Sequence, residues 1–584
     1  MCGIIAYNGQ KDAIPYLIDG IRNLEYRGYD SFGCAVDTDD GIIVKKDIGR
    51  IDDVVEKYKI NAMSAKRAIF HTRWATHGSV TKDNAHPMVD CAGKVAVVHN
   101  GIIENWEELK SELGTHKFVS DTDTEVLAHL VEERMKTGDS LDSAVRYTFG
   151  RIKGSSSFVV LNKGNDEMVA VKKGSPLVLG LAKSGTFVSS DVPSFIKHTN
   201  KVIYLNDGDM VRISKNKYEI TNLIDKNIRH KINTVNLAVK DLGKGEHEHF
   251  MLKEIMEQQE LLKNLESTDL SATQKAAALI KKARTVYLVG AGTSFHVARL
   301  GARLMRDNGM NAVPVQGQDL PSYKKILSKK DVFVIISQSG ETADIIKSLS
   351  VMNGNKKIGI INVEGSKLAY ESDILINVGA GPERAVASTK AFTLSAVHIT
   401  LLALFAAGKK KEALRDLNLM NINMYNLLVP SVMEAIDRAA QRIKGLESIF
   451  FLGRDYDYIL ALEGALKLKE IAYIHAEAID AATFKHGPLA LVTNKTYAVV
   501  IVSEDTKKDI MNNLQEFKAR KGKLVGIAES NAESFDLFIR MQSGGVFTFV
   551  MPTILLQLLA YKTSRQKNID PDYPRSLAKS VTVL

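Results

Sequence analysis

An internal repeat in the second half of the chain is the feature that most constrains the fold. Three short apolar segments, at residues 286–290, 333–337 and 358–361, recur in the same order at 449–453, 498–503 and 524–527. The offset is about 165 residues each time, and accidental matches rarely keep one offset. Continuous apolar strands that alternate with helical segments are typical of parallel sheets covered on both faces. The sequence therefore predicts two doubly wound α/β domains.

The N-terminal third has a different pattern. From Ile4 to about Arg212, short apolar runs of strand length are broken by Gly, Asn and Asp, and two helical segments are expected at 105–113 and 124–136. Short strands interrupted in this way predict a sheet-rich α+β domain.

Composition excludes some classes of function. The chain has 584 residues, 45% hydrophobic and 25% charged, with a net charge of +9. This charge suits anionic substrates, but the absence of a Lys/Arg block argues against nucleic acid. No basic segment followed by an apolar one indicates a secretory signal. The apolar stretch 391–408 is at the lower length limit for a membrane span, and we expect a buried helix there.

Cysteine usage is sparse. The three cysteines provide neither a disulfide framework nor a CxxC metal spacing, so we expect a cytoplasmic protein without metal or organic cofactor. Cys2, however, follows the initiator Met1. If Met1 is removed, one residue carries a thiol and an α-amine that titrates near about 8 and can accept the thiol proton. The alternative is an inert small residue before a strand.

Polar motifs at the predicted strand ends suit an amino-acid amide. Arg73 can bind an α-carboxylate through two hydrogen bonds, and Asp123 can hold an α-ammonium group. Asn100 and the backbone amide of Gly101 can stabilise an oxyanion. Each has an ordinary structural alternative, such as a tight turn, a helix cap or a stacked surface pair. Together with Cys2 they predict an amidase.

These motifs resemble the glutaminase domain of the N-terminal-nucleophile (Ntn) hydrolases, in the version found in the isomerizing glutamine–fructose-6-phosphate aminotransferase family. The resemblance covers nearly the whole chain. It implies a four-layer αββα sandwich in which Cys2 attacks the side-chain amide of glutamine and releases ammonia. It also implies that Trp74 gates an enclosed passage for ammonia, for which core packing is the alternative.

Two loops in the first repeat copy predict a phosphate site. Residues 290–294 and 337–342 follow apolar strands and open helices, so hydroxyls and helix N-termini can form an anion cradle. The second copy carries acidic groups instead. The pair resembles sugar isomerase (SIS) domains. The resemblance implies a sugar-phosphate site formed by Thr293, Ser294, Ser337, Gln338, Ser339 and Thr342, joined by Ser388.

The second copy carries its own charged helix. Glu463, Lys467 and Glu470 fall at i, i+4 and i+7 on one face, for which a solvated ion-pair stripe is the ordinary alternative. The resemblance implies that Lys579 forms a Schiff base with the open-chain ketose, that Glu470 moves a proton between C1 and C2 with Lys467 nearby, and that His486 assists ring opening.

We therefore predict a glutaminase domain over 1–235, a linker helix over 236–275, one SIS domain over 276–425 and a second with a catalytic tail over 426–584. The linker helix should be charged, with Phe250, Ile255 and Met256 among its apolar positions. The expected substrates are L-glutamine and fructose 6-phosphate, and the expected assembly is a homodimer. Alternatives are a paralogue acting on another ketose phosphate and a non-catalytic phosphosugar-binding regulator.

Two departures from the family pattern bear on sugar specificity. Thr483 stands beside His486 where relatives usually have Glu, and Arg384 alters the segment before Val386. None of the residues to which a catalytic role is assigned is replaced.

Overall fold

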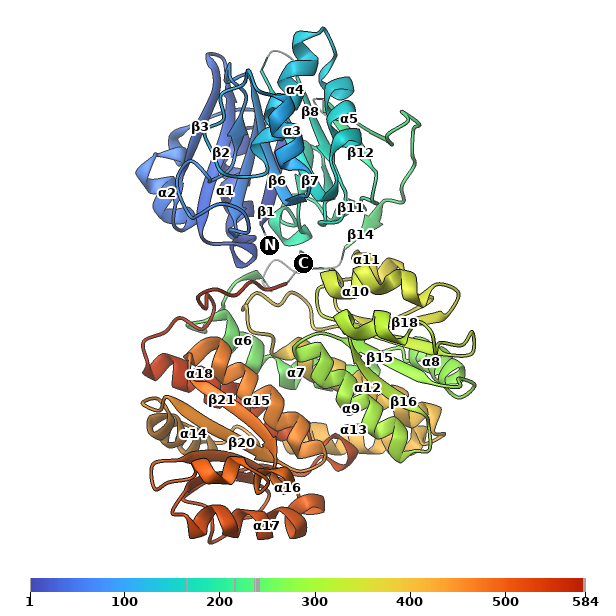
Figure 1. The fold of residues 1–584 in the computed structure, drawn as a ribbon, viewed down its shortest axis with the longest axis vertical. Coiled ribbons are helices and arrows are strands. Elements are labelled where there is room, and N and C mark those ends of the chain that lie inside the picture. The colour runs from blue at the N-terminus through green and yellow to red at the C-terminus, as the bar shows by residue number, and fades with distance from the viewer. Residues whose placement is uncertain (1, 164–165, 215–216, 236, 238–241, 581–584) are drawn as a thin grey trace. The chain divides into compact units, whose positions relative to one another are not determined.

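The computed structural model describes residues 2–163, 166–214, 217–235, 237 and 242–580. The described residues form two compact units (Figure 1). One consists of Met1–Gly243 with Ala578–Leu584, and the other of Lys244–Leu577. The domain boundaries predicted from the sequence stay predictions.

The first unit contains two antiparallel sheets within its described part. The larger has the order β14 (Asn233–Thr234), β11 (Lys201–Tyr204), β9 (Val178–Ala182), β10 (Gly185–Ser189), β1 (Gly3–Gly9), β4 (Arg67–Arg73), β2 (Ser31–Thr38), β3 (Gly41–Ile48). The smaller has the order β13 (Lys217–Thr221), β12 (Met210–Ser214), β8 (Glu167–Val171), β7 (Gly154–Asn162), β6 (Val95–Ile103), β5 (Met88–Val89).

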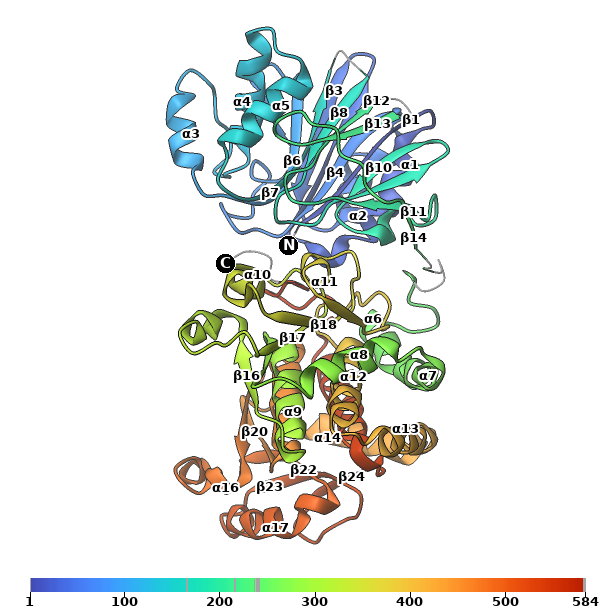
Figure 2. The same ribbon diagram turned by 90° about the vertical axis from the view of Figure 1, so that its right-hand side faces the viewer.

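Helices cover the outer face of each sheet (Figure 2). On the larger sheet these are α1 (Ala13–Arg22) and α2 (Ile51–Lys57), and on the smaller sheet α3 (Trp106–Glu112), α4 (Glu125–Lys136) and α5 (Leu141–Arg151). The predicted helices at 105–113 and 124–136 correspond to α3 and α4.

Side chains of each strand point alternately to the two faces of the sheet, and this alternation produces the layers of the first unit. In β1, Ile5 and Tyr7 pack toward the helices, whereas Ile4 and Ala6 pack into the core between the two sheets. Side chains of a strand point to opposite faces in turn, so a strand that is apolar at every position is buried on both sides. The result is the four-layer αββα sandwich that the resemblance implied.

The second unit contains two parallel sheets with matching strand orders within its described part. The first is β16 (Ala312–Gln316), β15 (Val286–Gly290), β17 (Val332–Ser337), β18 (Lys356–Ile361), β19 (Ile374–Asn377). The second is β21 (His475–Asp480), β20 (Ser448–Gly453), β22 (Tyr497–Val502), β23 (Lys523–Ala528), β24 (Leu537–Arg540). The repeat thus marks two copies of one doubly wound topology.

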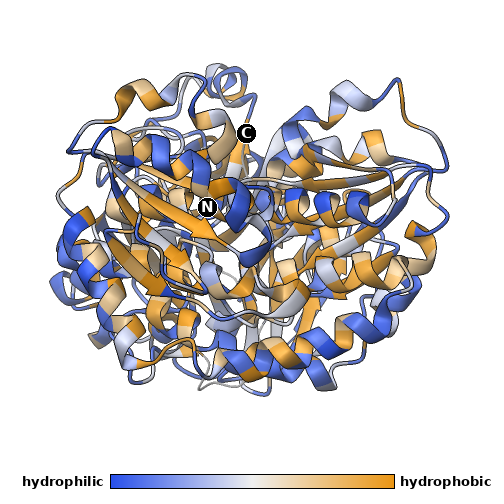
Figure 3. Cartoon of the chain, turned by 90° about the horizontal axis from the view of Figure 1, so that it is seen from below, coloured by the Kyte–Doolittle hydropathy of each residue, from blue (hydrophilic) through white to orange (hydrophobic). Residues whose placement is uncertain are grey.

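Helices surround both sheets, and a shared apolar core joins the inner faces of the two copies. The helices are α8 (Ser271–Ile280), α9 (Thr293–Asp307), α10 (Ala343–Lys347), α11 (Lys367–Tyr370), α12 (Lys390–Ala406), α13 (Lys410–Met424), α14 (Pro430–Ile443), α15 (Tyr456–Ala472), α16 (Ala481–Phe484), α17 (Glu504–Ala519) and α18 (Val550–Gln566). Figure 3 shows hydrophobic strands inside and mixed outer helices.

Two long apolar helices belong to this core. The predicted buried helix at 391–408 is α12, whose residues are nearly all buried. Among the described residues, one stretch, Gly545–Gln566, is long and apolar enough to cross a membrane, yet 78% of its apolar window is buried inside the fold. Burial of this kind is typical of a core helix.

The connector forms two short helices, α6 (Phe250–Met256) and α7 (Gln258–Asn264). Of its apolar residues, Phe250 and Ile255 are buried, whereas Met256 is 37% exposed. Asp572 accepts hydrogen bonds from the backbone N–H groups of Phe250 and Met251, at 2.8 and 2.9 Å, which satisfies the N-terminus of α6.

Close packing of α9 on α12 gives a test of this core. A Cβ added to Gly301 would lie 2.3 Å from Cγ1 of Ile399, so Gly301→Ala should lower the free energy of unfolding by about 1–3 kcal/mol through overpacking. Gly445→Ala is the control, since open space surrounds Gly445. Denaturant unfolding of both full-length variants measures the difference, and equal stabilities would contradict the packing.

Candidate functional site

Cys2 lies immediately before β1, at the centre of the larger sheet. Antiparallel pairing of β1 with β4 matches Gly3 with Thr72, so the start of β1 meets the end of β4. The Cys2 Sγ consequently accepts the Trp74 backbone N–H at 3.3 Å. The Cys2 carbonyl accepts hydrogen bonds from Arg27 Nε at 3.1 Å and Asn100 Nδ2 at 3.0 Å. The nucleophile candidate is therefore held by a backbone N–H at its sulfur and by two side chains at its carbonyl.

Burial governs the chemistry of this thiol. It raises the pKa of Cys2, although the chain-terminal charge, the Trp74 N–H and the nearby Arg73 and Arg27 guanidinium groups oppose the shift. A thiol with a raised pKa is protonated at neutral pH and needs a base before it can act as a nucleophile. The α-amine exposed on Cys2 by removal of Met1 is the predicted base; Met1 itself lies outside the described residues.

Arg73 and Asp123 lie in the same neighbourhood, because the charges of Cys2, Asp30 and Asp123 all act on the Arg73 guanidinium. Arg73 donates to the carbonyl groups of the loop 77–79, including Ser79 at 3.2 Å. Asp123 Oδ2 accepts the Ile103 N–H at 2.7 Å. Both side chains are thus positioned by backbone groups, and their roles toward an amino acid stay predictions.

Asn100 and Gly101 adjoin Cys2 at the end of β6. The Asn100 amide also donates to Ser190 Oγ at 2.9 Å, and its buried Oδ1 has no partner among the described residues. Gly101 has φ +140°, and a Cβ there would lie 1.9 Å from the Ser155 carbonyl oxygen, so the position requires glycine. The oxyanion role predicted for this pair needs the Asn100 N–H groups to turn from the Cys2 carbonyl to the substrate.

Trp74 is partly buried, and its ring packs edge-on against Tyr29 with 5.5 Å between ring centroids. This contact is consistent with either packing or gating, so the gate stays a prediction.

A second cluster of charged groups lies between the two repeat copies. Lys467 on α15 is fully buried, and its Nζ lies 3.3 Å from Glu463 Oε1 and 2.6 Å from Glu470 Oε2. The Lys467 Nζ also donates to Thr293 Oγ1 at 3.2 Å, at the start of α9. His296 of α9 bonds Glu463 Oε2 through Nδ1 at 2.7 Å. The predicted helix face is therefore a buried network and not a solvated stripe.

These neighbours set the charges. Burial alone lowers the pKa of Lys467, but the carboxylates of Glu463 and Glu470 outweigh it and raise this pKa well above the ordinary value. Burial alone raises the pKa of Glu463, but Lys467 and His296 outweigh it and lower this pKa. Lys467 therefore stays an ammonium group and Glu463 a carboxylate at neutral pH.

The predicted phosphate cradle follows β17. Ser337 Oγ lies 3.0 Å from Thr342 Oγ1 and accepts the Gly340 N–H at 2.9 Å, while Ser339 Oγ accepts the Glu341 N–H at 3.2 Å. These bonds fold residues 337–342 into a tight loop at the carboxyl end of a parallel strand. In doubly wound folds, this edge of the sheet is where ligands bind.

The remaining cradle candidates are arranged differently. Thr293 and Ser294 open α9, and the Thr293 hydroxyl belongs to the Lys467 network described above. Gln338 belongs to the loop 337–342. Ser388 donates its hydroxyl to Glu383 Oε2 at 3.0 Å, in the segment before α12. Its predicted contact with phosphate requires that bond to be exchanged.

His486 and Lys579 are not part of the buried network. His486 lies on an exposed turn after α16, and its backbone N–H donates to the Thr483 carbonyl at 2.9 Å. Lys579 is partly buried in the tail and groups with the first unit. The catalytic roles of both residues stay predictions.

Comparison with known proteins matches both halves of the chain. A family model described as a glutamine amidotransferase domain matches residues 71–197, and the SIS domain model matches 279–405 and 443–560. Proteins from Pyrococcus horikoshii and Thermus thermophilus, both named glutamine–fructose-6-phosphate aminotransferase (isomerizing), are 38% and 37% identical over the full length of each chain. The chain belongs to the isomerizing glutamine–fructose-6-phosphate aminotransferase family.

A solved structure of a C-terminal domain of this family, from Francisella tularensis, resembles the SIS half. It is 32% identical with a TM-score of 0.53, and covers 57% of this chain and all of that one. Membership of the family agrees with the fold expected from the sequence, an Ntn-type glutaminase domain followed by two SIS domains.

The structure shows the surroundings of Arg384 and Thr483, the two residues that depart from the family pattern. Arg384 packs over the ring of Phe250 with 4.1 Å to its centroid, and its backbone N–H donates to Glu254, so this residue ties its loop to α6. Thr483 is exposed at the end of α16, beside the His486 turn.

Sequence reasoning missed three buried histidines in the first unit. His71 Nε2 lies 3.1 Å from the His99 carbonyl, while His86 Nε2 and His99 Nδ1 lie 2.9 and 2.8 Å from Thr124 Oγ1. Burial lowers the pKa of His71 to about 3, and lowers the pKa of the other two as well. The motifs gave no signal, because burial of these rings depends on strands that meet only in the fold. His296 was missed for the same reason.

These histidines predict a pH-dependent stability. Between about pH 3 and 6.5, the unfolded chain binds a proton at His71 that the folded chain excludes, so stability falls as pH drops below about 6.5. When the pH is lowered from about 7.5 to about 5, the melting temperature of the unfolding transition of the first unit should decrease. His71→Gln, which keeps a donor for the His99 carbonyl, should reduce that fall. His77→Gln is the control, and an equal fall in all three chains would contradict the assignment.

The Lys467 network predicts a stability difference. Glu463→Gln leaves the buried ammonium with one carboxylate, and should lower the free energy of unfolding by about 3 kcal/mol, the lower end for a broken buried pair. Glu434→Gln, which breaks an exposed i,i+4 pair with Arg438, should change it by less than about 1 kcal/mol. Denaturant unfolding separates the two, and equal effects would contradict burial of the network.

Proposed function

We propose that this chain converts fructose 6-phosphate and L-glutamine to glucosamine 6-phosphate and L-glutamate. The observation that carries the proposal is the full-length match to relatives of that name, together with a thiol at the start of β1 among Arg73, Asp123 and Asn100. Neither half alone accounts for both a glutaminase and a sugar isomerase.

In the glutaminase half, the Cys2 thiol gives its proton to the α-amine that removal of Met1 exposes. The sulfur then attacks the side-chain amide carbon of glutamine. Asn100 and the Gly101 N–H stabilise the oxyanion, while Arg73 and Asp123 hold the α-carboxylate and α-ammonium groups. Collapse of the tetrahedral intermediate breaks the carbon–nitrogen bond, releases ammonia and leaves a γ-glutamyl thioester, which water hydrolyses to glutamate.

In the sugar half, the loop 337–342 binds the phosphate, with Thr293, Ser294 and Ser388. His486 assists ring opening, and the Lys579 amine condenses with the C2 carbonyl to a Schiff base, with loss of water. Ammonia then replaces the lysine, and Glu470 transfers a proton from C1 to C2 to give the aldose. The permanent charge of Lys467 supports a role beside Glu470 as an electrostatic partner.

Ammonia protonates or escapes if it is released into water, so the proposal includes an enclosed passage between the two sites, with Trp74 as its gate. It also includes a cytoplasmic homodimer. Exposed Thr483 beside His486 favours a second candidate, an enzyme of the same family that prefers another ketose phosphate. Product formation across a panel of ketose phosphates separates the two.

Paired substitutions test the division of labour. Cys2→Ala should abolish glutamine hydrolysis and leave the conversion of fructose 6-phosphate to glucose 6-phosphate at the wild-type level, because the residues proposed to bind the phosphate and Glu470 belong to the other unit. Glu470→Gln should lower aminosugar formation by about 10²–10⁴-fold through loss of the base, with glutamine hydrolysis retained.

Nitrogen-15 in the glutamine amide gives the decisive measurement. With fructose 6-phosphate present, mass spectrometry should find the label in glucosamine 6-phosphate. Label found only in bulk ammonium would contradict transfer between the sites. An active enzyme that keeps its initiator methionine would contradict the proposed base.

A further inference from the structure

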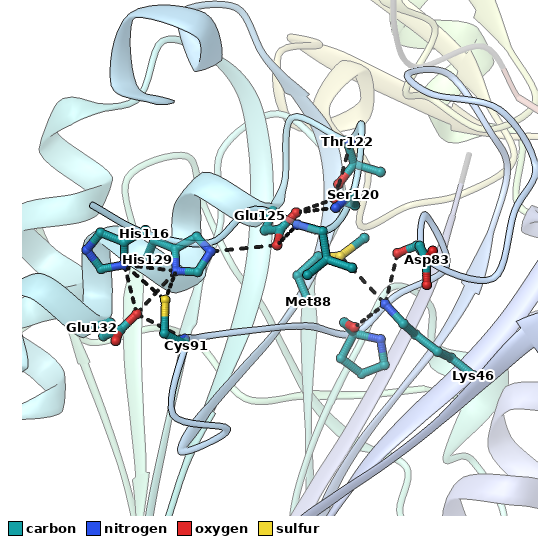
Figure 4. A network of polar contacts seen from close by, with 12 residues as sticks. Lys46, Asp83, Met88, Cys91, His116, Ser120, Thr122, Glu125, His129 and Glu132 are labelled. Carbon is teal, nitrogen blue, oxygen red and sulfur yellow. Dashed lines mark hydrogen bonds and ion pairs between the residues drawn. The ribbon is translucent and has the colours of Figure 1, made fainter. Parts of the chain in front are cut away.

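A cluster of four potential metal ligands lies in the first unit, outside both sites. Figure 4 shows the side chains of Cys91, His116, His129 and Glu132 pointing toward one another. One ligand atom from each lies within 4.8 Å of all the others. Cys91 follows β5, His116 lies between α3 and α4, and the other two are on α4. Three separate segments of chain thus converge on one point.

The distances fit a tetrahedral ion. His116 Nδ1 lies 3.1 Å from His129 Nδ1, and these two atoms lie 3.0 and 3.2 Å from Glu132 Oε2. Cys91 Sγ lies 3.5 and 3.7 Å from the same nitrogens. Four-coordinate zinc, with its usual bond lengths, gives edges of about 3.3 Å between nitrogen or oxygen ligands and about 3.6 Å between sulfur and nitrogen.

A carboxylate faces the far side of each ring, through a hydrogen bond at His116 and an ion-pair contact at His129. His116 Nε2 lies 2.7 Å from Glu133 Oε1, so the proton is on Nε2 and the lone pair of Nδ1 points into the cluster. His129 Nε2 faces Glu125 Oε1 at 3.6 Å, which favours the same tautomer. Carboxylates behind imidazoles in this way are typical of metal-bound histidine. Two facing lone pairs repel each other unless a cation lies between them.

Neighbouring groups also orient the carboxylate of Glu132. Its Oε2 accepts the Cys91 N–H at 3.1 Å, and its Oε1 pairs with Lys136 Nζ at 2.9 Å. These contacts orient Oε2 toward the two nitrogens. A thiolate and a carboxylate together balance the charge of a divalent cation, which offsets the cost of burying Glu132 beside the exposed Cys91.

We propose that Cys91, His116, His129 and Glu132 bind one Zn²⁺ ion. A thiolate with two imidazoles and one carboxylate suits zinc and not magnesium or calcium, which prefer oxygen ligands. Four protein ligands leave no open position, so the ion is structural. The spacing of these residues hid the site from sequence reasoning, which predicted a chain without metal.

The ion would clamp the segment that leads to Asp123. His116 begins this segment, and Glu125 holds its middle by accepting the N–H groups of Val119 and Ser120 at 2.8 and 2.7 Å. Zinc binding should therefore steady Asp123 at the start of α4. This consequence rests on the proposed function, and it predicts a higher KM for glutamine with little change in kcat when zinc is removed.

Metal content tests the site independently of activity. Full-length protein expressed with zinc, then dialysed, should retain about one zinc per chain by elemental analysis, as expected for a closed structural site. Cys91→Ser and His116→Ala should lose it. Cys34→Ala is the matched control, because that thiol lies in the core beneath α1 and α2, and it should retain zinc. Glu133→Gln, on the exposed side of α4, should weaken zinc binding about 10–100-fold.

Cobalt provides a spectroscopic readout of the same ligands. Co²⁺ added to chelator-treated protein should give a thiolate charge-transfer band in the wild type and Cys34→Ala, and none in Cys91→Ser. Circular dichroism confirms that each variant is folded. No retained zinc in the folded wild type, or equal zinc in wild type and Cys91→Ser, would overturn the proposal. Zinc retained with an unchanged KM on its removal would leave the site intact and overturn only its link to Asp123.

Discussion

The buried ammonium group of Lys467 is the constraint on which the second unit depends. A charge that is removed from water requires opposite charge and hydrogen-bond partners, and Glu463, Glu470 and Thr293 provide them. Thr293 belongs to the first repeat copy and the carboxylates to the second. The two copies are therefore joined by a directional charge network as well as by their shared apolar core, and α15 can pack on α9 in one register only.

In both units, buried carboxylates also accept backbone N–H groups at or just before the start of a helix. Asp572 accepts the first N–H groups of α6, and Glu383 accepts those of Thr389 and Ala391 at the start of α12, at 2.9 and 3.0 Å. Glu125 does the same for the segment before α4. Unsatisfied N–H groups at a helix start favour anions, so each carboxylate fixes a loop to a helix. Two of these loops carry predicted site residues, Ser388 before α12 and Asp123 before α4.

The sequence predicted the topology of the second unit because continuous apolar strands at a constant offset allow few alternatives. It also predicted that Glu463, Lys467 and Glu470 share a face, but not that the face is buried, since burial depends on α9. His296 escaped notice because its partner Glu463 lies 167 residues away. Apolar character on the short helix α6 did not say which side is covered, and Met256 is exposed while Phe250 and Ile255 are buried. The zinc ligands come from three segments whose approach only the fold determines.

Burial also divides the chemical roles among the residues. In the first unit it keeps the Cys2 thiol protonated, so that attack requires a base at the same position, and an α-amine on Cys2 meets this requirement. In the second unit the surrounding carboxylates keep Lys467 charged, and an ammonium group cannot form a Schiff base. The amine proposed to condense with the ketose is therefore another lysine, in agreement with the role predicted for Lys579. Lys467 instead stabilises the negative charge of Glu470, the proposed base.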